Sequence, residues 1–176
     1  MLYKVTPAIL LLVLLAVSTF YFFKNSTASI SSFEECASAG NSIMESYPRQ
    51  CRDAQGNVFV ENIGNELAKQ DFIQISSPRP GEVVSSPLRI TGQARGVWFF
   101  EATFPVVLVD WDGRIIAESF AIADGEWMTE NFVPFTATLI FEKPTYGKKM
   151  TLILRKDNPS GLPEHDDALE VPIFLE

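Results

Sequence analysis

The stretch that decides the fold runs from residue 103 to residue 120 and reads TFPVVLVDWDGRIIAESF. Strand-forming residues lie on both sides of Asp112-Gly113, a dipeptide that favours a tight hairpin turn. In the first run Phe104, Val106 and Leu108 would face one side and Thr103, Val107 and Val109 the other. The pattern predicts two antiparallel strands within the runs 98–111 and 114–121. Pro105 lies inside the first run and has no backbone N–H, so we expect it at an edge position or a bulge.

The residues on either side of this hairpin continue the strand pattern. Five further short runs have strand-like composition: 72–76, 88–94, 132–141, 149–156 and 171–175. Turn residues separate the runs, and no helical periodicity of useful length follows residue 24. About seven short strands in residues 72–176 predict an all-β domain, an antiparallel immunoglobulin-like β-sandwich. The Cys…Trp…Cys arrangement of antibody domains is missing, so we expect the likeness to be architectural.

The N-terminal residues 1–24 predict a membrane segment. Residues 5–23 carry no charge, and Lys4 and Lys24 bracket them. As a helix these residues would span about 28 Å, close to the thickness of the hydrocarbon core of a bilayer. The alternative is a cleaved signal sequence, with Ser26-Thr27-Ala28 as the cleavage site. We favour a single-pass anchor, and in either case we expect the rest of the chain to lie outside the cytoplasm.

Between the predicted anchor and the sandwich lie a spacer, a small module and a linker. Residues 25–32 are rich in Ser and Thr, and residues 33–62 contain Cys36 and Cys51, the chain's only cysteines. Their spacing matches no C-x-x-C redox or zinc motif. A disulfide would stabilise this loop by about 3 kcal/mol and needs an oxidising compartment; two buried free thiols are the alternative. Residues 63–71 look like a polar linker with one helical turn.

Composition and charge exclude several classes of protein. The chain has 22 acidic and 14 basic residues and a formal net charge of −8, whereas nucleic-acid binding needs clustered Lys and Arg. Two cysteines and one histidine leave little for a zinc site or a His-based catalytic triad. We predict no cofactor, no metal and no nucleic-acid partner. The apolar content of 47% is sufficient for a packed core.

Several segments, in this order, resemble those of a known family: 75–81 (ISSPRPG), 86–94 (SPLRITGQA), 98–102 (WFFEA), 110–113 (DWDG), 127–128 (WM), 132–135 (FVPF) and 156–161 (KDNPSG). Together they resemble the immunoglobulin-like domain of bacterial spore germination, a Gmad-type domain, over about residues 72–176. The resemblance implies a β-sandwich accessory domain of the bacterial cell envelope. It implies no established catalytic role.

The candidate partner or ligand patch combines aromatic, acidic and amide side chains: Trp98, Phe100, Glu101, Trp111, Trp127, Asp157 and Asn158. The three tryptophans are candidates for a platform that stacks wall sugars, and packing in the core and hairpins is the alternative. The polar residues 157–167 offer oxygen ligands for calcium, but their spacing matches no EF-hand. We therefore expect a structured loop in which Asp157 and Asn158 cap their own backbone.

These features predict a non-catalytic, membrane-anchored protein of the cell envelope. We expect the sandwich to bind or scaffold an envelope protein partner or a wall polymer, through loops at one end or an exposed sheet edge. The alternatives are a spacer, a glycan-binding module and a cell-wall-active hydrolase. A hydrolase needs paired carboxylates, for which Glu101 with Asp110 or Asp112 are the nearest candidates.

Overall fold

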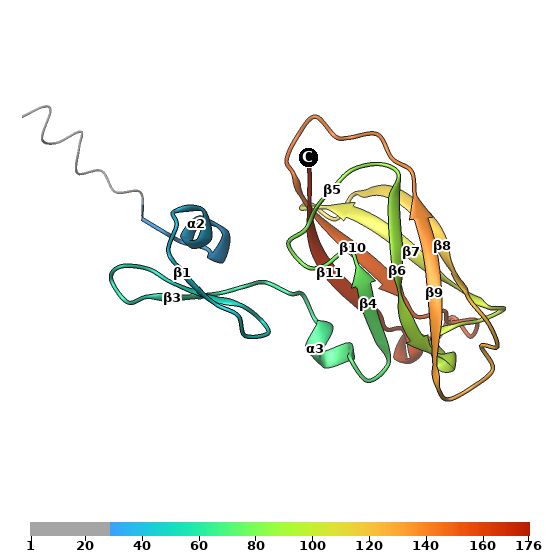
Figure 1. Ribbon diagram of the computed structural model, residues 1–176. Coiled ribbons are helices and arrows are strands. Elements are labelled where there is room, and N and C mark those ends of the chain that lie inside the picture. Colours follow the sequence, from blue (N-terminus) through green and yellow to red (C-terminus); the bar gives the residue numbers. More distant parts are fainter. Residues whose placement is uncertain (1–28) are drawn as a thin grey trace, which may run out of the picture. The chain divides into compact units, whose positions relative to one another are not determined.

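The computed structural model describes residues 29–176 (Figure 1). The predicted membrane segment lies outside these residues, and none of the helices in the described part is both long and apolar enough to cross a bilayer. The chain divides into two compact units. One holds the described residues up to Ile43 together with Cys51–Phe59, and the other holds Met44–Gln50 and Val60–Glu176.

The disulfide Cys36–Cys51 organises the first unit, which confirms the predicted bridge. Both cysteines are buried beside Phe33, and the S–S distance is 2.00 Å. The first cysteine lies on a short helix that begins after Ser32, whose hydroxyl accepts the N–H of Glu35. The elements around the bridge are α2 (Phe33–Ser38) and a three-stranded sheet in the order β1 (Ser42–Met44), β2 (Gln50–Arg52) and β3 (Val58–Val60).

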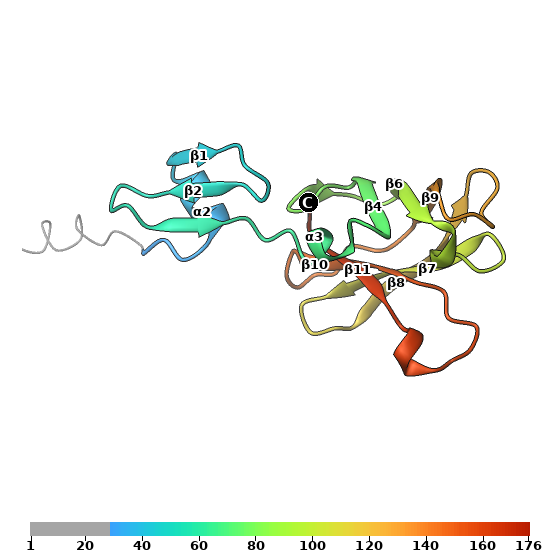
Figure 2. The same ribbon diagram turned by 90° about the horizontal axis from the view of Figure 1, so that it is seen from below.

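Eight strands in the second unit form one sheet in the order β4-β6-β9-β8-β7-β10-β11-β5. Their bounds are β4 (Ile73–Ser77), β5 (Val83–Val84), β6 (Leu88–Arg95), β7 (Thr103–Asp110), β8 (Ile115–Ala123), β9 (Phe132–Leu139), β10 (Lys149–Arg155) and β11 (Ala168–Leu175). Strands β8 and β9 pair only at Ile122↔Thr136 and Ala123↔Phe135, so the sheet turns back on itself there. Figures 1 and 2 show the result: β4, β6 and β9 face β7, β8, β10 and β11 as two layers.

The core lies between these two layers and follows the alternation of the strands. In β9 and β10 every second residue is buried. The Phe104 side chain, fully buried on β7, packs against Phe99 and Phe135 with ring centroids 5.2 and 4.9 Å away. Aromatic rings at these distances contribute packing energy beyond their buried area.

The first strand of the central hairpin is shorter than the sequence predicts. Gly96–Trp98 form a 3-10 turn (η1), and β7 begins only at Thr103. Between them Phe100 and Thr103 exchange two backbone hydrogen bonds of 3.0 Å around Glu101 and Ala102. The prediction of a strand from residue 98 was therefore wrong, because Glu101 and Ala102 have φ values of 49° and 63°. Neither residue is a glycine, so the sequence carries no signal for this turn.

Two further features concern Pro105, near the start of β7, and the short strand β5. Pairing of β7 with β10 ends at Val106, so Pro105 has a strand neighbour only on the β8 side, where it pairs with Phe120. Pro105 therefore has the single strand neighbour expected of an edge position, although β7 itself lies inside the sheet between β8 and β10. Strand β5 was not predicted; it is two residues long and pairs in parallel with Phe174 and Leu175 of β11.

Candidate functional site

The structure separates the three tryptophans of the predicted patch. Trp98 is 1% exposed and belongs to the core, and Trp127 packs half-buried beside it at the end of β8. Trp111 is 69% exposed and lies in the hairpin before β8. Because β8 is nine residues long, Trp111 and Trp127 lie at ends of the sandwich about 30 Å apart. The three rings therefore form no single platform.

The other residues of the predicted patch lie at the Trp127 end. Phe100 is 42% exposed and Glu101 is exposed in the turn before β7. The Asp157 N–H donates to the carbonyl of Trp98 at 3.0 Å. The Asn158 amide donates to the Leu162 carbonyl at 2.8 Å and to the Asp166 carboxylate at 2.7 Å. Asn158 thus closes its own loop, as expected from the sequence. Its side-chain amide is therefore already engaged in hydrogen bonds within the domain.

The carboxylate pair required for a hydrolase is not assembled. Glu101 precedes β7 and Asp110 ends it, and this eight-residue strand places them about 24 Å apart. Glycosidases hold their two carboxyl groups within roughly 9.5 Å. Asp112 follows Asp110 in the same hairpin and is also distant from Glu101. In the part of the chain from residue 29 onward, no three His, Cys, Asp or Glu side chains gather as a metal site.

Asp110 instead stabilises its own hairpin. Its carboxylate accepts the backbone N–H groups of Asp112 and Arg114 at 2.9 Å and the Tyr146 hydroxyl at 3.1 Å. Burial by itself would raise the pKa of the Asp110 carboxyl. These hydrogen bonds outweigh burial, with the Arg114 N–H the strongest, and hold the pKa below its usual range.

A second buried carboxylate, Glu61, is paired with Arg49. The Arg49 side chain donates to both oxygens of Glu61, with an Nε–O distance of 3.0 Å, and its backbone N–H donates at 3.2 Å. The hydrogen bonds from Arg49 lower the pKa of Glu61, against the raising effect of burial. Both residues belong to the second unit.

These lowered pKa values predict loss of stability in acid. The unfolded chain binds protons at Glu61 and Asp110 before the folded chain does, so folding is favoured above the ordinary carboxyl pKa of about 4 and weakens as pH falls below it. We expect the Tm to fall steadily from pH 5 to pH 2.5. Thermal melts across this range test the prediction, and Asp110→Asn should flatten the curve. A Tm that stays constant or rises in acid contradicts it.

The turn at Glu101-Ala102 gives a second prediction. Ala102 has φ 63°, which costs an L-residue about 1 kcal/mol and glycine almost nothing. We expect Ala102→Gly to stabilise the protein by about 1 kcal/mol in urea denaturation. Ala117→Gly within β8 is the matched control and should destabilise by about as much. Destabilisation by both substitutions would show that the turn is not strained.

The two ends of the eight-stranded sheet differ in how they are covered. At the β11 end, Asn65 donates its side-chain amide to the Ala168 carbonyl at 3.0 Å and accepts the Glu170 N–H at 2.8 Å. Further along, the Gly81 N–H donates to the Pro172 carbonyl at 2.8 Å, and β5 then pairs with the last residues of β11. Residues 64–65 and 81–84 thus cover parts of this edge.

At the other end of the sheet, strand β4 has a neighbouring strand on one side only. The Arg95 N–H donates to the Phe72 carbonyl at 2.8 Å, so the hydrogen-bonded pairs between β4 and β6 fall at alternate residues from there. In an antiparallel ladder the residues between such pairs direct their N–H and C=O groups away from the partner strand. Ile73 and Ile75 are these residues, and within residues 29–176 their outward groups have no backbone partner.

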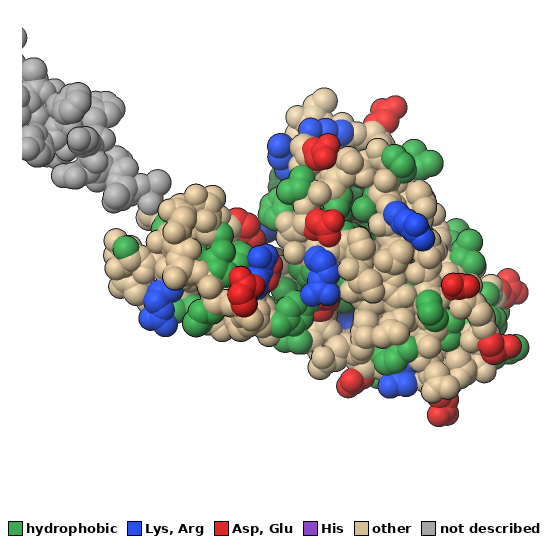
Figure 3. Space-filling view, in the orientation of Figure 1, with side chains coloured by type: hydrophobic (Ala, Val, Ile, Leu, Met, Phe, Trp, Pro, Cys, Tyr) green, Lys and Arg blue, Asp and Glu red, His purple; other side chains and the backbone are tan. Residues whose placement is uncertain are grey.

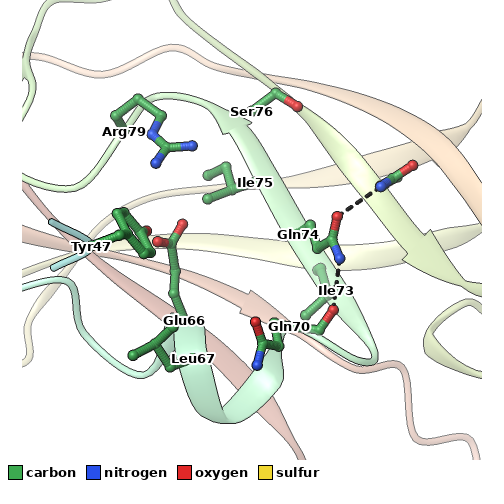
Figure 4. A pocket seen from close by; sticks show the side chains of 10 residues that line it. Tyr47, Glu66, Leu67, Gln70, Ile73, Gln74, Ile75, Ser76 and Arg79 are labelled. Atoms are coloured by element: carbon green, nitrogen blue, oxygen red, sulfur yellow. Dashed lines mark hydrogen bonds between the residues drawn. The ribbon is translucent and has the colours of Figure 1, made fainter.

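A groove of about 460 Å³ lies beside β4 (Figure 4). One side is β4, and the other is the short helix α3 (Glu66–Lys69), which contacts both β4 and β11. Its lining residues are Tyr47, Glu66, Leu67, Gln70, Ile73, Gln74, Ile75, Ser76, Arg79 and Gln93. Every lining residue belongs to the second unit.

Charged and amide side chains line the groove. Figure 4 shows the Glu66 side chain extending from α3 toward Arg79. The Arg79 guanidinium lies 5.4 Å from the centroid of the Tyr47 ring. Along the outer face, the Gln93 amide donates to Gln74 at 2.7 Å and the Gln74 amide donates to the Gln70 carbonyl at 2.8 Å.

Burial raises the pKa of Glu66, and the positive charge of Arg79 opposes this effect. A raised pKa means that the groove disfavours the charged form of this carboxylate unless a cation is near. The sequence did not single out Glu66, Arg79 or Tyr47. Arg79 stands between two prolines in the segment 75–81, whose sequence indicates a turn and the family resemblance but no groove. No local pattern marks Glu66 as a groove residue.

The strand order and the paired layers define an immunoglobulin-like β-sandwich, and the comparisons with known proteins agree. The model of a family described as the immunoglobulin-like domain of bacterial spore germination matches residues 72–161, about half of the chain. The chain therefore belongs to this family, as the sequence motifs suggested. The match ends in the loop before β11, the last strand along the chain. No curated protein and no solved structure matches the chain.

Proposed function

We propose that the chain is a non-catalytic cell-envelope protein, anchored in the bacterial membrane by its N-terminal segment, whose exported sandwich binds a protein partner. Membership of the spore-germination family, which is not a known enzyme family, supports an accessory role. The disulfide supports an oxidising compartment outside the cytoplasm.

The observation that carries the binding role is the asymmetry of the sheet. One edge of the sandwich is covered by residues 64–65 and 81–84, whereas β4 at the other end has a neighbouring strand on one side only and has a groove beside it. Natural sandwiches usually protect such edges, because an open edge pairs with other chains. On the face that carries β4, acidic and basic side chains are interspersed, as at the polar rim of an interface (Figure 3).

A wall polymer is the second ligand class expected from the sequence. Sugar stacking needs aromatic faces that are exposed and close together. Trp98 is buried and Trp111 lies at the opposite end from Trp127. The geometry therefore favours a protein partner over a glycan.

Site-specific photo-cross-linking tests the proposal. A photoreactive amino acid is placed at four well-exposed apolar positions spread over the sandwich: Leu67, Phe120, Met128 and Leu162. In the envelope of a bacterium that expresses the full chain, we expect the same protein to be cross-linked reproducibly from at least one position. Absence of a reproducible protein adduct at all four positions would overturn the binding role and favour a spacer. Protease treatment of spheroplasts tests export: the sandwich should be degraded from outside.

A further inference from the structure

We propose that the middle of strand β8 binds an extended segment of the protein partner as an added strand, and that this segment carries a Lys or Arg side chain that pairs with Glu118. This inference rests on the proposed function and names the surface and the chemistry of the partner. Three features of β8 support it: its unpaired backbone groups, the exposure of its residues and the character of its outer face.

Strand β8 has a second neighbouring strand at one end only. Its pairing with β9 is limited to Ile122 and Ala123, whereas β7 pairs with it from Ile115 to Ile122. The residues of β8 before Ile122 therefore have β7 on one side and, within residues 29–176, no strand on the other. This part of β8 is an edge, although the strand lies inside the order of the sheet.

Glu118 and Phe120 provide the hydrogen-bonding groups of this edge. The Ala123 N–H donates to the Ala102 carbonyl at 2.8 Å, so the hydrogen-bonded pairs with β7 fall at alternate residues from Ala123. Glu118 and Phe120 lie between these pairs and direct their N–H and C=O groups away from β7, about 7 Å apart. In the described part of the chain these groups have no backbone partner.

Solvent reaches this edge. Phe120 is 58% exposed and Glu118 is exposed, and the small residues Ala117 and Ser119 beside them are only half-buried. The strand β4 differs, because its outward-directed residues at positions 73 and 75 are only 1% and 5% exposed, backbone included. Of these two edges, β8 is the one whose residues a partner can reach.

The outer face of β8 combines apolar side chains with one carboxylate. Ala121 is buried in the core, so the alternate side chains of Glu118, Phe120 and Ile122 lie on the other face. Phe120 and Ile122 are 58% and 61% exposed. An added strand would place apolar side chains beside these two residues and a further side chain beside Glu118.

The charge of Glu118 points to a basic partner residue. Glu118 is the only charged residue of β8, and in the described part of the chain it forms no ion pair. Val107 lies opposite it on β7, and Ile153 of β10 lies opposite Val107, so its neighbours across the sheet are aliphatic. Opposite charges on paired strands stabilise the pair, and the net charge of −8 attracts a basic segment.

A second copy of this chain fits the edge poorly. Antiparallel pairing of two β8 strands through the groups of Glu118 and Phe120 places the two Glu118 side chains directly or diagonally opposite each other. Like charges at such positions are destabilising, and two chains of net charge −8 repel each other. We therefore assign the edge to a basic, extended segment of a different protein.

Peptide selection tests the charge. A phage-displayed library of random linear dodecapeptides is selected against the full chain in detergent micelles. We expect the selected peptides to be enriched in Lys or Arg and to bind Glu118→Gln at least tenfold more weakly than the unaltered chain. Glu164→Gln is the matched control, because Glu164 is exposed on the loop before β11 and its substitution should leave affinity unchanged.

Two measurements with a selected peptide test the backbone pairing independently of charge. In NMR, binding should slow exchange of the Glu118 and Phe120 amides and leave the Ser119 amide, which pairs with Val106 of β7, unchanged. Phe120→Pro removes an outward N–H at an edge, a place where proline is tolerated. It should bind at least tenfold more weakly than Phe120→Ala, which removes the ring alone.

Several results would overturn the inference: failure to select any peptide, equal affinity for Glu118→Gln, unchanged exchange at both amides, or equal affinity for Phe120→Pro and Phe120→Ala. Sedimentation of the full chain as a dimer that Phe120→Pro abolishes would assign the edge to a second copy and overturn it too. Photo-cross-linked adducts from Leu67, Met128 or Leu162 but none from Phe120 would also overturn it, while leaving the proposed binding role intact.

Discussion

Replacing Phe104 by alanine is expected to destabilise the sandwich by about 4 kcal/mol. The Phe104 ring is fully buried between the two layers. It packs on Phe99, which lies between η1 and β7, and on Phe135 of β9. Removing it forfeits the transfer free energy of the ring and leaves a cavity that neighbouring strands cannot collapse to fill. Domains of this size are stable by about 5–15 kcal/mol, so much of the stability would be lost.

Urea denaturation followed by tryptophan fluorescence measures this effect, because Trp98 lies in the same core. The matched control is Phe120→Ala on β8, where the ring is 58% exposed. We expect a change of no more than about 0.5 kcal/mol there. If Phe104→Ala cost about the same as Phe120→Ala, the two-layer packing described here would be wrong.

Removing the disulfide is expected to unfold the small unit around it. The double substitution Cys36→Ser and Cys51→Ser should cost this unit about 3 kcal/mol, because the bridge closes a loop with a sequence separation of 15. The buried cluster there consists only of Phe33 and the two cysteines, with a few half-buried neighbours. A core this small supplies little hydrophobic stabilisation to replace the bridge.

Hydrogen exchange of the full chain measures this loss. Amides of α2 should exchange much faster in the serine variant, whereas amides of β7 and β10 serve as an internal control and should keep their protection. Dithiothreitol should reproduce the effect in the unaltered chain and do nothing further to the serine variant. Persistent protection in α2 after removal of the bridge would contradict the prediction.

Much of the fold could be predicted from the sequence because the signals are local. Alternation of period two marked the strands, and Asp112-Gly113 marked the hairpin between β7 and β8. The turn at Glu101-Ala102 escaped prediction, since neither residue is one that favours positive φ. The two-residue β5 is too short for any pattern.

The candidate site was harder to predict than the fold. Aromatic residues in the sequence drew attention to Trp98, which the layers bury, and to Trp111, which lies at the far end from Trp127. Burial and proximity depend on which strands face one another. Glu66 and Arg79 approach each other only because α3 packs beside the edge of β4.

The sequence by itself determined the class of fold, the family and the cysteine pair available for a bridge, because composition, motif order and spacing are properties of neighbouring residues. Only the tertiary structure decided that no strand pairs beyond β4, whereas β5 pairs beyond β11. The reason is physical: an edge is open or covered according to the order of strands that are distant along the chain. Asn65 reaches β11 across a hundred residues, and no local pattern records that contact.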